Sequence, residues 1–135
     1  MSDSGERPIF PGLRGMRLGA LATAIHERSD AARAGTLTPD DVTGATFTLT
    51  NAGGYGTLLT APVISQPQVA ILSTDGVAAR PVAVPTGDGH GIAVHPVGNL
   101  SLSFDHRAFD GAYASAFLRR VVELLETRHW GEELA

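Results

Sequence analysis

Hydrophobic and polar residues follow a helical period early in this chain. Between residues 18 and 34, apolar side chains recur three and four positions apart, which predicts an amphipathic helix. Gly35 comes directly after this segment and is expected to end the helix, because glycine adopts the left-handed backbone of a C-cap without strain. The apolar side is predicted to hold Leu18, Leu21, Ala22, Ile25, Ala32 and Ala34, and the polar side Glu27, Arg28, Asp30 and Arg33.

The middle of the chain follows the two-residue period of β-strands. A turn is expected over residues 36–44, where a proline and two aspartates occur together. In residues 45–53, Phe47 and Leu49 alternate with threonines, which predicts a half-buried strand. A glycine-rich loop over residues 53–62 is expected to follow.

Further strands are expected before residue 106. Residues 68–84 predict a short buried strand, a turn at Asp75 and Gly76, and a second strand. The sequence "TGDGHG", residues 86–91, is typical of a hairpin turn. Residues 92–106 predict either one interrupted strand or two successive strands.

A final helix is predicted over residues 111–127, so the order of elements is α-β-β-β-β-α. This order favours an α+β fold or a mixed-sheet sandwich. Residues 1–17 contain glycine and proline without a period and are expected to form an irregular arm. Because no strand precedes the first helix, a sheet built from residues 45–105 alone is expected to be an antiparallel meander. One face or edge of that sheet is expected to need another chain.

Composition limits the classes of protein that fit this pattern. With 135 residues, 43% of them hydrophobic and 18% charged, the chain is predicted to form a single domain with a core. A net charge of −4 does not favour nucleic acid or an anionic membrane as a partner. The sequence has no bilayer-length apolar segment and no signal-peptide pattern, so a soluble cytoplasmic protein is expected.

Two residue types do not occur in the sequence, cysteine and lysine. Without cysteine, the chain has no disulfide, no thiolate ligand for a metal and no cysteinyl acyl-enzyme. Without lysine, it cannot carry a lipoyl, biotinyl or pyridoxal group on a lysine amine.

Charged residues gather between the last predicted strand and the last predicted helix. They are Asp105, His106, Arg107 and Asp110. An imidazole has an ordinary pKa of about 6.5 and suits general base catalysis near neutral pH, and the strand before His106 can fix its ring. The alternative is a salt-bridged turn that caps the helix. The local sequence leaves both interpretations open.

A second candidate site follows the first predicted strand and consists of Thr50, Asn51, Gly53 and Gly54. The Thr50 hydroxyl can donate to a developing oxyanion, and glycines allow a substrate to approach the backbone closely. The alternative is an ordinary turn after a threonine-rich strand. No metal site is predicted, because the remaining histidines match no metal-binding spacing. They are His26, His90, His95 and His129.

Four colinear segments resemble the catalytic domain of the dihydrolipoamide acyltransferases of 2-oxo acid dehydrogenase complexes. They are "ARAGTLTPDDVTG", "GATFTLTNAGGYG", "APVISQPQVAILSTDGVAARPVAV" and "LSLSFDHRAFDGAYASAFL". The resemblance implies an α+β fold like that of chloramphenicol acetyltransferase, a two-layer sandwich of a mixed sheet with flanking helices. Residues 18–135 are then a partial catalytic domain, truncated at the N-terminus, since the earlier strands and long first helix of the family have no counterpart here.

The resemblance also implies roles for individual residues. His106 matches the general base that deprotonates the acceptor. Thr50 matches the oxyanion donor, which is usually serine in the family, and Asp110 matches an acid expected to hold the turn and His106 in place. The same match assigns substrate binding to Asn51, Gly53 and Gly54, and structural pairing to Asp105 and Arg107.

Cofactors and partners follow from the same resemblance. Acyl-CoA is the expected donor, with no lipoyl group and no metal in this chain, and a thiol or hydroxyl on a small molecule or carrier is the expected acceptor. A hydroxyl of a tetronate-type natural-product intermediate is one example. Family members act as trimers with a site between chains, so a homo-oligomer is expected, together with a separate chain for the missing N-terminal half.

Two other interpretations compete with an acyltransferase. One is a non-catalytic oligomeric scaffold or interaction module that keeps the fold and the motif as architecture. The other is a degenerate remnant. The intact "DHRAFDG" and "TNAGG" segments argue against a remnant, which has no physical need for both, but they do not separate an enzyme from a scaffold.

Overall fold

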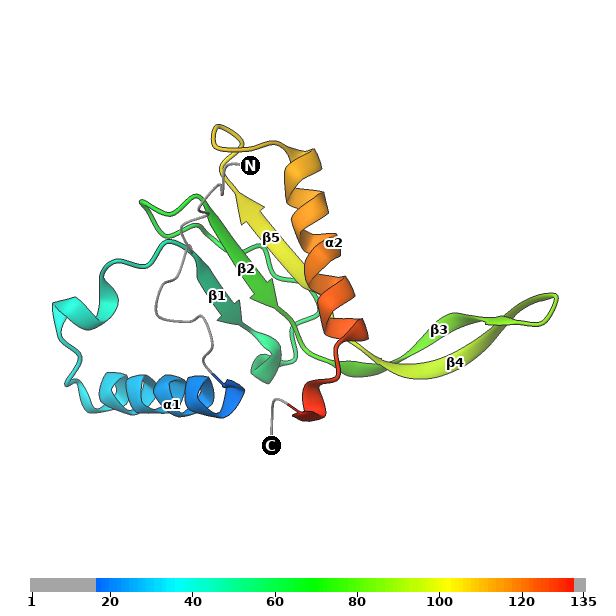
Figure 1. Ribbon diagram of the computed structural model, residues 1–135, viewed down its shortest axis with the longest axis horizontal. Coiled ribbons are helices and arrows are strands. Elements are labelled where there is room, and N and C mark those ends of the chain that lie inside the picture. The colour runs from blue at the N-terminus through cyan, green and yellow to red at the C-terminus, as the bar shows by residue number, and fades with distance from the viewer. Residues whose placement is uncertain (1–16, 133–135) are drawn as a thin grey trace, which may run out of the picture. The chain divides into compact units, whose positions relative to one another are not determined.

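The computed structural model describes residues 17–132 (Figure 1). The irregular arm predicted over residues 1–17 lies outside this range except for Arg17. The chain divides into two units, one of residues up to 43 together with residues from 127, and one of residues 44–126.

The first unit contains the helix predicted from the early apolar spacing. Helix α1 spans Leu18–Ala34 and ends at Gly35, whose φ of 68° is left-handed, so the predicted range and C-cap are confirmed. The predicted turn forms a short 3-10 helix, η1 (Pro39–Val42), with a capping box between Thr38 and Asp41. Ile25, predicted on the apolar side of α1, is 59% exposed.

The second unit is built on a three-stranded sheet. Its strands are β1 (Thr48–Asn51), β2 (Ala70–Thr74) and β5 (Leu100–Phe104), in the order β1-β2-β5. Strand β1 pairs with β2 in parallel, and β2 pairs with β5 in antiparallel fashion. The predicted antiparallel meander is therefore wrong. Residues 52–69 carry the chain back along the sheet before β2 begins, as a parallel connection requires.

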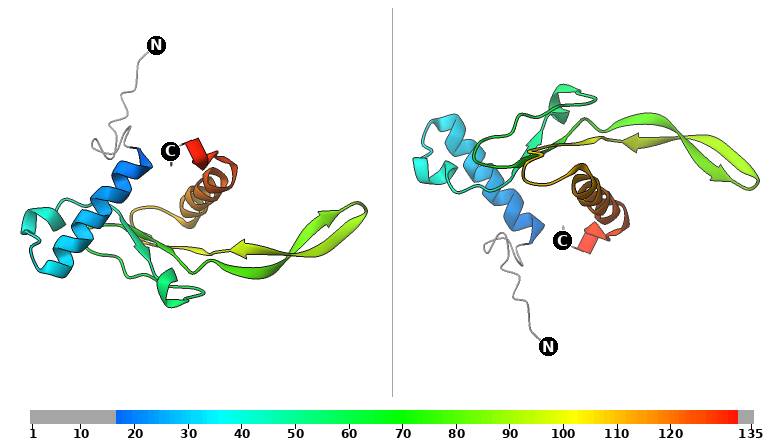
Figure 2. Two further views of the ribbon diagram at one scale, coloured as in Figure 1. Left: turned by 90° about the horizontal axis from the view of Figure 1, so that it is seen from below. Right: turned by 90° about the horizontal axis from the view of Figure 1, so that it is seen from above.

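The hairpin predicted around residues 86–91 is confirmed and forms a separate two-stranded sheet. Strand β3 (Ala78–Thr86) pairs with β4 (Gly89–Val97), and the turn contains Gly87 with a φ of 36°. The segment after the turn therefore gives two successive strands, β4 and β5. The twisted ribbon of the hairpin extends away from the three-stranded sheet (Figure 2).

The core lies between the sheet and one helix. Helix α2 (Gly111–Thr127), predicted over the same residues, lies along one face of the sheet (Figure 1). Central strand β2 contributes most of the buried residues, and Phe47 meets Phe117 of α2 edge-on at 6.1 Å between ring centroids. The buried apolar residues in the described part of the chain are Ala70, Ile71, Leu72 and Ala114. Neither α-helix in residues 17–132 is long and apolar enough to cross a membrane.

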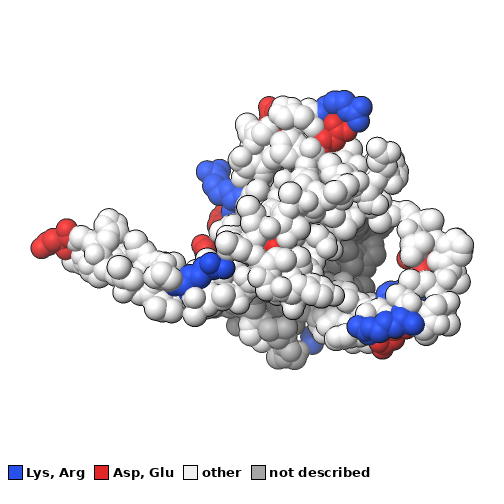
Figure 3. Space-filling model, turned by 180° about the vertical axis from the view of Figure 1, so that it is seen from behind, with Lys and Arg blue, Asp and Glu red and all other residues white. Residues whose placement is uncertain are grey.

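One face of the hairpin is apolar and uncovered. Cross-strand partners share a face of a sheet, and on this face Pro81 is opposite Val94 and Ala83 is opposite Ile92. Ile92 is 83% exposed and Val94 is 70% exposed. In Figure 3 most of the hairpin surface in view carries neither basic nor acidic side chains.

Candidate active site

His106 lies in the turn that joins β5 to α2. Strand β5 ends at Phe104, two residues before it, and the His106 ring lies 5.6 Å from the Phe104 ring, centroid to centroid. The side chain is exposed and has no hydrogen bond or ion pair with any residue in the described range. An imidazole in this state is free to bind a proton from a molecule that approaches from solvent.

An ion pair shapes the turn directly around His106. The Asp105 carboxylate accepts the backbone N–H of Arg107 at 2.9 Å, and the Arg107 guanidinium donates to it through Nε at 3.0 Å and Nη2 at 2.6 Å. These hydrogen bonds hold the pKa of Asp105 down at about 2. Because both partners flank His106, their pairing fixes the backbone on each side of the imidazole.

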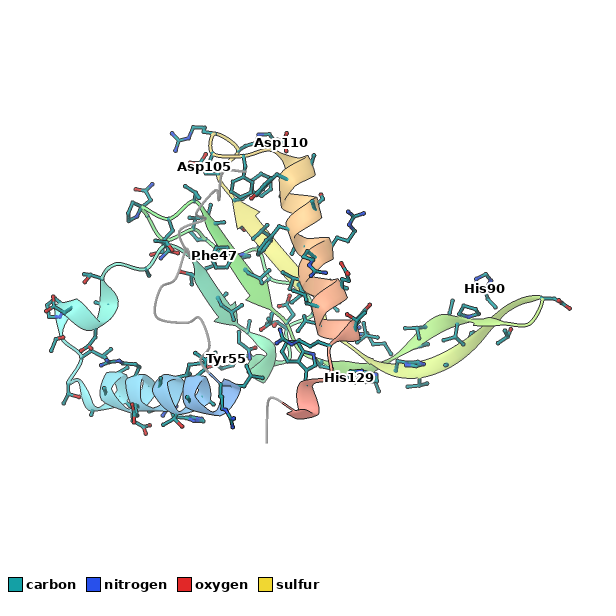
Figure 4. All side chains as sticks on the ribbon, in the orientation of Figure 1. Phe47, Tyr55, His90, Asp105, Asp110 and His129 are labelled. Atoms are coloured by element: carbon teal, nitrogen blue, oxygen red, sulfur yellow. The ribbon has the colours of Figure 1, made fainter. Side chains whose placement is uncertain are left out.

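Asp110 closes the other end of the turn. Its Oδ1 accepts the N–H of Tyr113 at 2.9 Å, which is the side-chain cap of an N-terminal helix turn. Phe109 stacks on Phe104 at 4.9 Å between ring centroids. Asp110 therefore fixes the start of α2 and makes no hydrogen bond or ion pair with His106. Any effect of Asp110 on the imidazole passes through the turn. Figure 4 shows Asp105 and Asp110 at this end of the unit.

An open pocket of about 450 Å³ lies beside this turn. It is lined by Asp105 and Arg107 together with residues 64 and 66–69 of the connection that leads into β2. His106 is not among the lining residues. The turn therefore presents the ion pair to the pocket and the imidazole to solvent.

The second group of predicted residues lies at the end of β1. Thr50 is half-buried, and Asn51 is exposed and accepts the N–H of Gly53 on its own Oδ1 at 2.8 Å. A Cβ on Gly53 would lie 3.1 Å from the backbone oxygen of Asp75, so a larger residue here would be tight against the Asp75 backbone. Gly54 has open space around it.

Thr50 and His106 lie at opposite ends of the sheet. Thr50 is level with Ser73 of β2, and Ser73 is opposite Ser101 of β5. From Ser101 the chain runs about 10 Å further to Phe104, at about 3.3 Å per residue, and then enters the turn. The arrows of β1 and β5 point in opposite directions in Figure 1, so the carboxyl ends of these two strands lie at opposite edges of the sheet. A single chain does not bring this base and this hydroxyl together.

Asp75 is the site feature that the sequence did not reveal. Its position before Gly76 predicts a turn, but the side chain is only 5% exposed and accepts hydrogen bonds from Thr57 and Thr60. The only signal in the sequence is that an acid directly follows the buried strand β2. Among residues 17–132, no group of three histidine or acidic side chains is placed to hold a metal ion.

The family to which the chain belongs follows from comparison with known proteins. The profile of the 2-oxoacid dehydrogenases acyltransferase (catalytic domain) family matches residues 8–130. The chain therefore belongs to this family, and the resemblance seen in the four colinear segments is confirmed.

Individual relatives agree with the family match. The acetyltransferase component of the pyruvate dehydrogenase complex of Mycobacterium bovis is 39% identical over 88% of this chain, which spans 22% of that protein. The Azotobacter vinelandii dihydrolipoamide acetyltransferase, studied for the catalytic role of one serine, one histidine and one asparagine, is 36% identical with a TM-score of 0.72; the match covers 79% of this chain and 42% of that one.

A third relative is the cubic core of a pyruvate dehydrogenase multienzyme complex. It is 34% identical with a TM-score of 0.76, and the match covers 84% of this chain and 45% of that one. These structures confirm the predicted α+β fold with a mixed sheet. The chain spans less than half the length of each of these two solved relatives.

Proposed function

We propose that this chain is the catalytic part of an acyltransferase that moves an acyl group from acyl-CoA to a thiol or hydroxyl. Acetyl is the first acyl group to test, because the relatives described above are acetyltransferases. The observation that carries the proposal is the exposed His106 in a turn fixed at one end by the Asp105–Arg107 pair and at the other by Asp110. Such a turn holds an unpaired imidazole in one place.

In the proposed reaction, His106 acts as general base. It takes the proton from the acceptor thiol or hydroxyl as the acceptor atom attacks the thioester carbonyl. The Thr50 hydroxyl donates a hydrogen bond to the resulting oxyanion. The tetrahedral intermediate collapses with cleavage of the C–S bond, and the CoA thiolate takes the proton back from His106. Since the sequence has no cysteine, direct transfer without a cysteinyl intermediate fits the chain.

The relative from Azotobacter vinelandii supports the choice of residues. The histidine and the asparagine studied in that enzyme are four residues apart, and so are His106 and Asp110. Threonine keeps the hydroxyl of a serine, so Thr50 retains the donor that the reaction requires.

The proposed site lies between two copies of the chain, with His106 from one and Thr50 from the other. The separation of these residues along the sheet supports this arrangement, because one chain keeps them at opposite ends. The related cubic core supports an oligomer. We propose a trimer, in which each chain gives its base to one neighbour and its oxyanion donor to the other.

A separate chain is proposed to complete the domain. The solved relatives are more than twice as long as the parts this chain matches, and β1 is an edge strand whose Leu49 is 66% exposed. A strand from another polypeptide alongside β1 would pair with the free backbone N–H and C=O groups of that edge. A hydroxyl on a tetronate-type intermediate is one proposed acceptor.

The second candidate function is a non-catalytic oligomeric scaffold. The uncovered apolar face of the hairpin favours it, since such a face is suited to binding another chain whether or not any reaction occurs. This candidate needs no free imidazole at position 106.

The experiment that separates the two is a CoA-binding and transfer assay on the assembled protein. Native mass spectrometry is carried out on the chain alone and on the chain co-expressed with any neighbouring gene product that resembles the part of the family's catalytic domain that this chain does not match. Acetyl-CoA is titrated into both samples. We expect a trimer or hetero-oligomer that retains CoA and transfers acetyl. His106→Ala should abolish transfer and leave the assembly intact, and His26→Ala, on exposed α1, serves as the matched control. Transfer that survives His106→Ala removes the catalytic assignment, and an assembly that never binds CoA favours the scaffold.

A further inference from the structure

Asp75 is a buried acid at the end of the central strand. Its carboxylate accepts three hydrogen bonds from the loop of residues 52–60: from Thr60 Oγ1 at 2.6 Å, from Thr57 Oγ1 at 3.1 Å and from the Thr60 N–H at 3.2 Å. The hydrogen bond from the Thr60 hydroxyl is the main cause that lowers the pKa of Asp75, so the ionised form is favoured. A buried charged acceptor with this many donors holds its partners firmly.

The backbone around Asp75 is tied to the same loop. The Asp75 N–H donates to the Asn99 carbonyl at 3.1 Å, and the Asn99 side chain donates to the Leu58 carbonyl at 2.6 Å. The Gly76 N–H donates to the Thr57 carbonyl at 2.9 Å. The loop is therefore joined both to the end of β2 and to the residue that precedes β5.

These contacts reach back to the strand that carries Thr50. Thr57 Oγ1 lies 2.9 Å from the Ala52 carbonyl as well as 3.1 Å from the Asp75 carboxylate, and its single hydrogen is shared between them. Ala52 donates its N–H to the Thr74 carbonyl at 3.1 Å. Gly53 lies so close to the Asp75 backbone that a Cβ would be 3.1 Å from its oxygen. Ala52 is thus held by Thr74 and by Thr57, and Thr57 is in turn bonded to the Asp75 carboxylate.

We propose that Asp75 is a positioning residue for the acyl-transfer reaction, which fixes Thr50 by clamping the loop of residues 52–60 against the end of β2. This inference rests on the proposed function. Loops are usually more mobile than the strands they connect. An oxyanion donor is effective only when it is held in place before the charge develops, and a displacement of about 1 Å can cost about a hundredfold in rate.

The test compares Asp75→Asn with Asp75→Ala in the assembled protein, and uses Asp88→Asn in the exposed hairpin turn as the matched control. Asparagine keeps one oxygen that can accept from the threonine hydroxyls. Its side-chain NH₂ replaces the oxygen that accepts the Thr60 N–H, so that hydrogen bond is lost. We expect kcat for acetyl transfer to fall about 10- to 100-fold in Asp75→Asn and further in Asp75→Ala, while KM for acetyl-CoA stays within about threefold. Asp88→Asn should behave as wild type. A role in folding alone lowers the amount of folded protein and leaves kcat per folded site unchanged.

Amide hydrogen exchange tests the clamp without any need for activity. In Asp75→Asn the amides of Thr60 and Gly76 should exchange about tenfold faster, while those of β2 and β5 keep their protection. Unchanged exchange at these two amides overturns the clamp. Faster exchange with an unchanged kcat overturns the positioning role. If the wild-type assembly transfers no acyl group, the proposed function fails and the positioning role fails with it, and the exchange data still report on the clamp by themselves.

Discussion

At the scale of single residues, two aspartates define the turn that presents His106. Asp105 pairs with Arg107 beside the imidazole, and Asp110 caps the helix that follows. The sequence offered a choice between a catalytic base and a salt-bridged, capped turn. The structure contains the salt-bridged, capped turn, and the same turn leaves His106 unpaired and exposed. The two interpretations are therefore compatible, because the pairing of Asp105 with Arg107 fixes the backbone that carries the imidazole.

The Asp105–Arg107 pair predicts a dependence of stability on acid pH. The folded-state pKa of Asp105, about 2, lies below its ordinary value of 3.8. A lowered pKa means that the stabilisation is fully present above pH 4 and is lost as the pH falls from about 4 to about 2. Urea unfolding of wild type and Asp105→Asn across this range measures the effect. We expect the difference between their free energies of unfolding to shrink towards pH 2; a constant difference contradicts the assignment, and Asp88→Asn should follow wild type.

Thr50 gives the second prediction at this scale. Thr50→Val replaces the hydroxyl by a methyl group of similar size, and kcat should fall a few hundredfold if the hydroxyl stabilises the oxyanion. Thr50→Ser keeps the donor and should stay within about tenfold of wild type. Steady-state kinetics on the assembled protein measures both. Equal losses in the two variants would show that shape at this position matters and the hydroxyl does not.

At the scale of elements, the β3–β4 hairpin is long and forms a two-stranded sheet that is not paired with the three-stranded sheet of its unit. A free two-stranded hairpin is marginally stable in water. Here one face carries Ile92 and Val94, which are 83% and 70% exposed. This pattern favours a surface that is buried in an assembly.

We predict that a charged residue on the apolar face of the hairpin weakens the oligomer. Ile92→Lys, with or without Val94→Lys, should convert the oligomer to smaller species, because a buried lysine at an apolar contact is costly. His95→Ser on the opposite face is the control, since His95 pairs with Arg80 in the register and is exposed. Light scattering after size-exclusion chromatography measures the mass. An unchanged mass for Ile92→Lys means that the oligomer forms through another surface.

At the scale of the whole molecule, the fold separates the two halves of the proposed site. The carboxyl ends of β1 and β5 point in opposite directions, so Thr50 and His106 cannot serve the same reaction within one chain. An oligomer brings the two residues together if the carboxyl end of β1 in one copy meets the carboxyl end of β5 in another copy at the interface between them. The symmetry of a closed oligomer then gives every copy the same site.

Mixing two inactive variants tests the shared site. Thr50→Val and His106→Ala chains are co-expressed, and random assortment gives about a quarter of the sites an intact threonine from one chain and an intact histidine from the other. Acetyl transfer should therefore recover to about a quarter of the wild-type rate, although each variant alone is expected to keep less than about 1% of it. No recovery in oligomers that native mass spectrometry shows to be mixed would place both residues in one chain's site.

The helices and the hairpin could be predicted from the sequence, because each depends on neighbours a few residues apart. The ranges of α1 and α2, the Gly35 cap and the hairpin at Gly87 follow from apolar period and turn chemistry, and the structure confirms them. Family membership followed from four colinear segments and is likewise confirmed. The residues named for the site stay predictions.

The pairing of the strands and the burial of polar groups could not be predicted from the sequence, because they depend on contacts between distant parts of the chain. Three features depend on residues that are 15 or more positions apart in the sequence. They are the parallel pairing of β1 with β2, the separation of Thr50 from His106, and the burial of Asp75 against Thr57 and Thr60. Local period carries no information about such contacts, since a strand looks the same whichever neighbour and direction it adopts. An aspartate before a glycine likewise predicts an exposed turn. Here the carboxylate is buried, because the fold brings the hydroxyls of Thr57 and Thr60 from a distant loop to it.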